Sequence, residues 1–299
     1  MDWDDLRIFL AVARNDSLSG AGRVLRIDPA TVGRRVARLE QAVAAALFAK
    51  TPQGYALTDH GLRLLDHAER AEAAVEGAAN ALTGAEGVSG QIRIGAPDGC
   101  ANYLLPQVIA QICNANPGLE VQIVALPRVF NLSKREADMA IAVSRPVAGR
   151  LTVQKLTDYH LHLAASNDYI ASHAPIMTPS DLAAHRIVGY IPDMIFDKEL
   201  DYLTEIGASA PTLASNSVSV QLNFLRHGAG VGVVHDFALP AAPELRRIIP
   251  EQIQLTRAFW LIRHQGDGRA ERLNRFADQL IRAARAEMAR LEAYGVQLG

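Results

Sequence analysis

The sequence predicts a multidomain α/β chain with a small helical domain at its N-terminus, one long helix and a larger α/β domain. Three observations support this division. Apolar residues recur at helical spacing over residues 4–40, and a proline-free stretch rich in Ala, Glu, Leu and Arg covers residues 59–85. Beyond a glycine-rich boundary at residues 84–90, short apolar strands alternate with helices. A length of 299 residues with 49% apolar content allows two or three domains with sizeable cores.

The N-terminal domain is predicted to contain a helix over residues 4–15, a second over residues 19–25, a tight turn and a third helix. The third begins at Asp28-Pro29, because Asp is a favoured N-cap and Pro is favoured at the first helical position. Ser17 and Ser19 are expected to cap the second helix, with contact to DNA phosphate as the alternative. The small core is predicted to include Leu6, Phe9, Leu10, Ala13, Ala21, Leu25, Val32, Val36 and Leu39.

Basic residues concentrate beside the predicted third helix. Residues 20–50 contain six basic residues and two acidic ones, although the whole chain has a formal net charge of -2. Arg34, Arg35 and Arg38 fall on or beside the outward face, a profile that fits a DNA major groove. We expect Arg34 to contact base edges and the other two to contact phosphate or bases. The alternative is that all three are solvated surface residues.

The next two segments are predicted to be a hairpin and a long helix. Pro52 and Gly54 separate two short apolar segments, which indicates a small hairpin that would form a wing beside the helix-turn-helix. Residues 59–85 form one helix with a short heptad seam of Leu65, Ala68, Glu72, Val75, Ala79 and Leu82. We favour a dimer-forming linker helix, since a helix-turn-helix usually binds DNA as a pair. The alternative is a helix packed on its own domain.

The remaining chain predicts a mostly parallel sheet covered by helices. Helices are expected over residues 103–114 and 269–294. Strands are expected at residues 91–95, 120–124, 138–143, 151–156, 160–165, 186–190, 231–235 and 258–263.

Several function classes are not supported by the residues. The N-terminus has neither the basic nor the apolar region of a secretory signal, and no apolar run reaches the roughly 18 residues of a membrane span, so we expect a cytoplasmic protein with no membrane partner. Two cysteines make no disulfide framework, and the histidines lack metal-ligand spacing. There is no P-loop, dinucleotide fingerprint or G-x-S-x-G, so we expect no enzyme, catalytic residue, cofactor or metal.

The chain resembles the LysR-type transcriptional regulators over nearly its full length. The specific part of the match is N-terminal: Leu6-Arg7-Ile8-Phe9, Ser17-Leu18-Ser19-x-Ala21, residues 29–40, Leu47-Phe48 and Leu57-Thr58-x-x-Gly61. A looser match follows in Ile92-Arg93-Ile94-Gly95, Leu105-Pro106, Asn116-Pro117, residues 136–141, Asp181-Leu182-Ala183 and residues 228–232. Gly33, Asp28-Pro29-Ala30 and Pro52-Gln53 depart from the family, which usually has a hydroxyl residue, Ser-Gln-Pro and a basic wing tip there.

The resemblance implies a ligand-responsive regulator of transcription. Residues 1–58 would be a winged helix-turn-helix, residues 59–88 a dimerising linker helix, and residues 89–299 an effector domain like a periplasmic binding protein. Its lobe I would cover about 89–163 and 267–295, and lobe II about 164–266. The partners implied are double-stranded promoter DNA, a small-molecule effector with organic acids as a candidate class, and further copies in a homodimer or homotetramer. The expected DNA-binding residues are Ser19, Thr31, Arg34, Arg35 and Arg38.

Effector-binding residues are expected where strands end, because ligands of open α/β sheets bind there. The candidates are Asp98, Gly99, Cys100, Ala101, Asn102, Arg128, Arg145, Asn216 and Ser217. Helices that start near Asp98 and Ser217 would offer free N–H groups to an anion. Asp98 is expected to cap its own helix. Arg128 or Arg145 would pair with a ligand carboxylate, or else be merely exposed.

Cys100 has two interpretations. A thiol at a helix start is a possible redox sensor, but we favour a small residue that lines the pocket. Cys113 follows thirteen residues later on what is predicted as one helix, roughly 20 Å away, so a direct disulfide would require local unfolding. The weaker functional alternative is a cytoplasmic solute-binding module without gene regulation. A solute-binding or transport-type module would predict a secretory signal and no helix-turn-helix, and the sequence shows the reverse.

Overall fold

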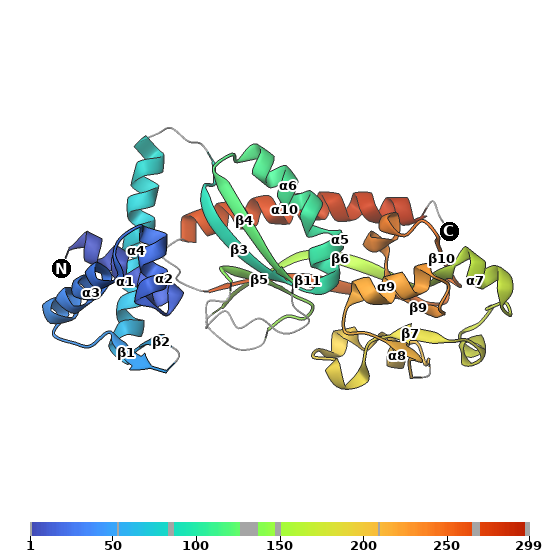
Figure 1. Cartoon of the computed structure of the whole chain (residues 1–299). Coiled ribbons are helices and arrows are strands. Elements are labelled where there is room, and N and C mark those ends of the chain that lie inside the picture. Colours follow the sequence, from blue (N-terminus) through green and yellow to red (C-terminus); the bar gives the residue numbers. More distant parts are fainter. Residues whose placement is uncertain are drawn as a thin grey trace. The chain divides into compact units, whose positions relative to one another are not determined.

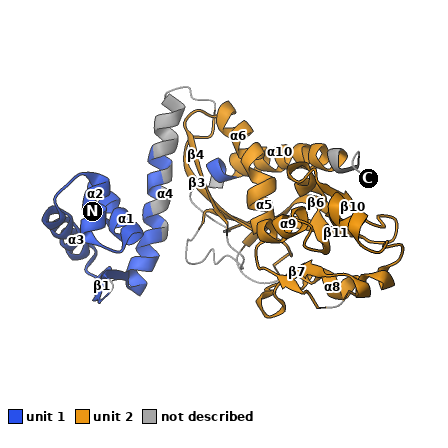
Figure 2. Cartoon of the chain, turned by 45° about the vertical axis from the view of Figure 1, so that its right-hand side comes forward, with its two compact units in different colours: residues 1–86, 266–273 blue, residues 87–265, 274–299 orange. Residues whose placement is uncertain are grey.

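The computed structural model divides the chain into two compact units. It describes residues 2–52, 54–82, 87–125, 137–146, 151–208, 210–264 and 270–296. Unit 1 comprises residues 1–86 with 266–273, and unit 2 comprises residues 87–265 with 274–299 (Figure 2). The first boundary lies in the glycine-rich stretch identified from the sequence.

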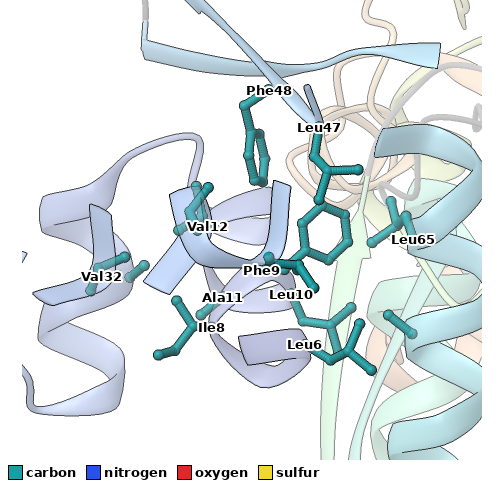
Figure 3. Close-up of a cluster of buried hydrophobic side chains, with 14 residues drawn as sticks. Leu6, Ile8, Phe9, Leu10, Ala11, Val12, Val32, Leu47, Phe48 and Leu65 are labelled. Atoms are coloured by element: carbon teal, nitrogen blue, oxygen red, sulfur yellow. The ribbon is translucent and has the colours of Figure 1, made fainter. Parts of the chain in front are cut away.

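Unit 1 begins with the three predicted helices, α1 Trp3–Asn15, α2 Leu18–Leu25 and α3 Pro29–Val43. The predicted N-cap residues of α2 and α3 each bind a backbone N–H in the first turn of their helix. The Ser17 hydroxyl accepts a hydrogen bond from the Gly20 N–H at 2.9 Å, and the Asp28 carboxylate accepts one from the Ala30 N–H at 2.8 Å. Most of the predicted core residues are buried, and Ala13 and Leu25 are partly buried against the same cluster, part of which Figure 3 shows.

The predicted wing is confirmed as an antiparallel hairpin of β1 Phe48–Thr51 and β2 Gly54–Leu57. Gly54 is required at its position, because its φ is +133° and an added Cβ would lie 2.2 Å from the Asp16 carbonyl oxygen. The Tyr55 N–H donates to the same oxygen at 2.8 Å. Glu40 on α3 accepts hydrogen bonds from the N–H groups of Leu47 and Phe48. The wing is therefore fixed to both ends of the helix-turn-helix.

Helix α4 covers Asp59–Leu82. Leu65 and Ala68 from the predicted seam are buried in the unit 1 core, and Glu72 forms an ion pair with Arg14 on α1 at 2.5 Å. The first half of the seam therefore packs within unit 1. Spacings of three and four place residues on one face of a helix, and that face can pack on any apolar surface, not only on a second helix. Val75 is 51% exposed. The side chains of Ala79 and Leu82 lie outside the described residues.

Unit 2 is built around one sheet of nine strands in the order β4-β3-β5-β11-β6-β9-β7-β8, with β10 paired to β6 (Figure 1). The strands are β3 Gly90–Ala96, β4 Leu119–Ala125, β5 Met139–Ala142, β6 Leu151–Ser166, β7 Ile187–Gly189, β8 Leu213–Ala214, β9 Val231–His235, β10 Leu245–Arg247 and β11 Gln254–His264.

The expectation of a mostly parallel sheet is wrong at the centre of the sheet. Strands β3, β4 and β5 are parallel, as are β7, β8 and β9, but β6 and β11 are antiparallel to each other and to their neighbours. The reason is that β6 crosses from one parallel group to the other and β11 returns. We call the group around β3, β4 and β5 lobe I and the group around β7, β8, β9 and β10 lobe II.

Residues 151–156 and 160–165, expected as two strands, form the single strand β6. Polar Thr157 and Asp158 interrupt the apolar pattern, yet they continue the pairing opposite Phe259 and Ala258 of β11. A crossover strand changes its surroundings along its length, so its apolar pattern changes too.

The helices of unit 2 also differ in detail from expectation. Residues 103–114, predicted as one helix, fall at the end of α5 Asp98–Tyr103 and within α6 Leu105–Ala115. Cys100 and Cys113 therefore lie on different helices, and both are free thiols. The last helix is α10 Ala270–Val296, which is red in Figure 1. It contacts β6 through Glu292, whose carboxylate accepts a hydrogen bond from the His160 N–H and lies 2.8 Å from the Nδ1 of the His160 ring. The other helices of lobe II are α7 Asn167–Ser172, α8 Tyr202–Glu205 and α9 Val218–Arg226.

Candidate functional site

The first turns of α3 carry an exposed arginine. Arg34 is exposed, and its guanidinium donates to the Thr31 hydroxyl at 3.0 Å. Within the described residues it pairs with no carboxylate. Pro29 and Ala30, one turn earlier, are also exposed. The N-terminal part of α3 is therefore a free surface that carries one uncompensated positive side chain.

Arg35 and Arg38 have a different environment, because both contact the buried carboxylate of Asp5 on α1. Arg38 donates two hydrogen bonds to it, at 2.7 and 2.6 Å, and Arg35 donates one at 3.3 Å. Burial raises the pKa of Asp5, but the hydrogen bonds and charges of the two arginines outweigh this and hold that pKa below its ordinary value. These contacts fix α3 against α1, a role that the acidic start of the chain could have indicated.

Gly33 is explained by the packing of α3 on α2. A Cβ at this position would lie 3.3 Å from the Leu18 side chain. Glycine therefore avoids a tight contact between the two helices. In exchange, the chain lacks the hydroxyl side chain that the family usually has at this position. Ser19, near the start of α2, is exposed.

Further positive charge lies beside α3. Arg23 and Arg26 at the end of α2 and Lys50 on β1 are all exposed, and none of them pairs with a carboxylate in the part of the chain that the structure describes. The sequence identified them only through a count of charges. The surface of unit 1 thus carries several exposed cations on α2, α3 and the wing, which suits a polyanion.

In unit 2 a small cavity of about 20 Å³ lies between the lobes. Lobe I contributes Asp98, Gly99 and Cys100 from α5 with the preceding Pro97, and Val143 after β5. The remaining lining residues are Tyr190, Phe196, Leu200, Asn216, Val218 and His235 from lobe II and Phe259 from the crossover strand β11. Four predicted residues, Asp98, Gly99, Cys100 and Asn216, therefore meet at one site.

Asp98 does not cap its own helix, which corrects the expectation. Its Oδ2 accepts hydrogen bonds from the Ser217 hydroxyl at 3.0 Å and from the Ser219 N–H at 3.1 Å. Both partners belong to the N-terminus of α9 in lobe II. The lobe I carboxylate therefore occupies the helix terminus that was expected to attract an anionic ligand.

In a second contact across the cleft, lobe II supplies the aspartate and lobe I supplies the serine. The Ser144 hydroxyl, after β5 in lobe I, donates to the carboxylate of Asp197 in lobe II. Each lobe thus supplies one aspartate to a serine of the other. We call these two contacts the aspartate–serine bridges. They connect the two lobes beside a cavity with room for roughly one water molecule.

His235 is a functional candidate that the sequence did not single out. It is 5% exposed, and its Nδ1 has no hydrogen-bond partner among the described residues. Its ring stacks on Tyr159 at 5.5 Å between centroids. Burial lowers the pKa of His235 to about 4, against partial compensation by Asp236 and Asp98. The side chain is therefore a neutral polar group at the cavity, and its only advance signal was its place at the end of a predicted strand.

Phe259 enters the cavity because β11 is irregular at this point. The register of β11 against β6 shifts between Phe259 and Trp260, and such a bulge redirects side chains. Periodicity in the sequence does not reveal a bulge.

The other predicted effector residues do not line the cavity where the structure describes them. Ala101 is buried and does not line it, whereas Asn102 donates to the Asp98 carboxylate at 3.0 Å. Arg145 lies over the Trp260 ring, 5.8 Å from its centroid, and does not line the cavity either. Arg128 lies outside the described residues.

Cys100 is fully buried, and burial raises the pKa of its thiol. The thiolate needed for rapid oxidation is disfavoured, so the geometry favours the pocket-lining interpretation. Among the described residues, no three His, Cys, Asp or Glu side chains gather as a metal site. None of the described helices is long and apolar enough to cross a membrane.

Comparison with known proteins identifies both units. The family described as "Bacterial regulatory helix-turn-helix protein, lysR family" matches residues 3–62, and "LysR substrate binding domain" matches residues 85–285. The transcriptional regulator PtxR of Pseudomonas aeruginosa is 26% identical over 259 residues, 84% of this chain and 82% of the relative.

Two solved structures show the same fold. That of CrgA, a LysR-type transcriptional regulator from Neisseria meningitidis, matches with a TM-score of 0.57 and 21% identity over 95% of this chain and 99% of that one. Full-length LysG of Corynebacterium glutamicum with bound effector Arg matches with a TM-score of 0.62 and 19% identity, over 95% and 98% of the two chains.

Proposed function

Because the chain belongs to the LysR-type family of transcriptional regulators, we propose that it binds a promoter through α3 and the β1–β2 wing. Arg34 enters the major groove and contacts base edges, while Ser19 and Thr31 contact the DNA backbone. The observation that supports this most directly is the exposed first part of α3, where Arg34 is free of carboxylates within the described residues. Arg pairs well with guanine in this geometry.

Arg35 and Arg38 are positioning residues in this proposal. Their contacts with Asp5 set the angle of α3 on α1 and so the direction in which Arg34 points. Arg23, Arg26 and Lys50 supply phosphate contacts, which contribute affinity without sequence preference.

The DNA proposal is tested with a fragment from upstream of the chain's own gene, first footprinted and then titrated by fluorescence anisotropy. Arg34→Ala should lower affinity for the protected fragment about 5- to 100-fold relative to scrambled DNA. Arg7→Ala, an exposed arginine on α1, is the matched control and should preserve the preference. Equal selectivity in Arg34→Ala and wild type would remove Arg34 from base recognition.

We propose that the small-molecule effector binds between the lobes at the cavity lined by Asp98, Asn216 and His235. LysG, which shares the fold, is described with a bound effector, Arg. The cavity of about 20 Å³ is too small for such a molecule, so effector entry must part the aspartate–serine bridges. Separation of the lobes would then couple effector binding to the arrangement of subunits on DNA.

The proposed dimer uses α4 beyond Glu72, because the preceding half of the seam is already packed within unit 1. Exposed Val75 marks the start of this surface. Val75→Glu should raise the dimer dissociation constant in analytical ultracentrifugation, whereas Leu62→Glu, at an exposed apolar residue earlier on α4, should not. An unchanged dimer in Val75→Glu would place the interface elsewhere.

A further inference from the structure

Lobe II contains a second and larger cavity, of about 320 Å³. It lies between the strands β7 and β9 and lining residues within 190–208 and 210–211, with α8 as one wall; Figure 1 shows α8 beside β7. Its volume is at the lower end of the range for small-molecule pockets, roughly 300–1,000 Å³. We call it the lobe II pocket.

The described polar groups that line this pocket include one carboxylate and no cationic side chain. Asp201 supplies a carboxylate, of which one oxygen accepts the Thr204 N–H at 3.3 Å. Gln221 is buried, and its amide nitrogen donates to the Ser215 carbonyl at 2.7 Å, which leaves the amide oxygen as an acceptor. None of the described lining residues is Arg, Lys or His. The described part of the pocket is therefore negative.

Two aromatic rings in the lining also favour a cationic ligand. Tyr190 and Tyr202 both line the pocket, with ring centroids 5.9 Å apart and an interplanar angle of 59°. Aromatic faces attract ammonium groups through their quadrupoles, and paired rings are a common way to hold organic cations. Arg257 already lies over one face of the Tyr202 ring, 6.0 Å from its centroid, where it pairs with Glu199 and Glu205. The rest of the wall is apolar, with Ile195, Leu203 and Val233 among its residues.

We infer that the lobe II pocket binds a small organic cation, an ammonium group carried on a compact apolar body. The ammonium group would lie against Asp201 and the tyrosine rings, and the body would fill the apolar part. A carboxylate of the same shape would meet the charge of Asp201. The inference does not rest on the proposed DNA and effector sites, although Tyr190 and Leu200 also line the cavity between the lobes.

The test is isothermal titration calorimetry of the full chain without DNA, using three probes of similar size. Phenethylammonium carries the cation, 2-phenylethanol is neutral and 3-phenylpropanoate is an anion. We expect the cation to bind one-to-one, at least about tenfold tighter than the alcohol, and the anion not to bind. Failure of the cation to bind, or equal affinity for all three probes, would overturn the inference.

Two variants locate the site. Asp201→Asn keeps an N-cap residue on α8 and should lower cation affinity about tenfold without changing alcohol affinity, whereas Asp193→Asn, an exposed acid outside the pocket, should change neither. Ala210→Trp at the exposed rim should block binding, and Ala183→Trp, exposed on the 3-10 helix Pro179–Ala184, should not. Unchanged cation binding in both pocket variants, with native circular dichroism, would place the ligand elsewhere and overturn the assignment.

Discussion

Unit 1 and the cleft of unit 2 use a carboxylate from a neighbouring helix in opposite ways. In unit 1, Asp5 engages Arg35 and Arg38 and leaves Arg34 free, so the acid selects which cation faces outward. In unit 2, Asp98 occupies the N-terminus of α9, so the acid fills the place where a ligand group would bind. In the proposed function, the first carboxylate organises the surface that binds DNA, whereas the second occupies the place proposed for the effector.

The largest effect that we expect concerns the pH dependence of unit 2. His235 remains neutral in the folded state down to pH about 4, whereas in the unfolded chain it takes up a proton near its ordinary pKa of 6.5. The unfolded state therefore binds more protons between these values, and stability is lost as pH falls through this window, by up to about 1.4 kcal/mol per pH unit. Above pH 6.5 the contribution is complete.

The measurement uses the two tryptophans, one in each unit. With Trp3→Phe, denaturant unfolding followed by Trp260 fluorescence reports on unit 2. His235→Phe should flatten the dependence between pH 6.5 and 4, whereas His227→Phe, at the end of α9, should retain it. The same slope in His235→Phe and its parent would assign the effect to other groups.

The second effect tests the unit 1 side of the comparison. Asp5→Asn removes the charge that engages two arginines, so we expect a loss of about 2 kcal/mol in the free energy of unfolding, followed by Trp3 fluorescence in a Trp260→Phe background. The released arginines should also tighten non-specific DNA binding. The slope of the logarithm of the binding constant against the logarithm of salt concentration should become steeper by about 1–2.

The matched control for Asp5→Asn is Asp4→Asn, whose exposed carboxylate contacts Arg35 only at 3.7 Å. It should change stability and salt dependence little. The pKa of Asp5 is lowered in the folded state, so the ion pairs stabilise the wild type relative to Asp5→Asn above the ordinary carboxyl pKa of 3.8. This difference in the free energy of unfolding is lost as pH falls below that value. A stability difference that persisted unchanged at pH 2 would contradict this ion-pair account.

The smallest effect tests the cleft. Ser217→Ala removes the 3.0 Å hydrogen bond to Asp98 and the N-cap contact with the Val220 N–H, a loss of about 1 kcal/mol. Amide hydrogen exchange at the start of α9 should become about fivefold faster, because the lobes separate more often. Ser172→Ala on α7, away from the cleft, should leave this exchange unchanged. Identical rates in both variants would mean that the bridge does not hold the lobes together.

The elements of unit 1 could be predicted because their determinants are local. Ser17 and Asp28 cap helices through residues only two or three positions away, and the wing turn lies between adjacent strands. What the sequence did not reveal is the pairing of Asp5 with Arg38, 33 residues away. An acidic cluster beside a basic helix is a signal, but it does not identify which arginines are engaged.

The cleft was predictable in part, because strand ends indicated Asp98, Cys100 and Asn216. The partner of Asp98 was not predictable, since Ser217 lies 119 positions later and is brought near only by the crossover strands. His235 and Phe259 were missed for the same reason, since His235 ends a lobe II strand and Phe259 lies at a bulge in β11. Local patterns identify elements, whereas tertiary topology decides which of their ends meet.

The contact between Asp98 and α9 makes the protein carry its own competitor. An effector that needs the lobes apart binds only the unbridged fraction, so its apparent dissociation constant exceeds the intrinsic one by the reciprocal of that fraction. Each increment of about 1.4 kcal/mol in favour of the bridged state raises the concentration at half-response tenfold. If the effector binds between the lobes as proposed, the strength of the two aspartate–serine bridges sets the concentration at half-response, independently of the side chains that recognise the effector.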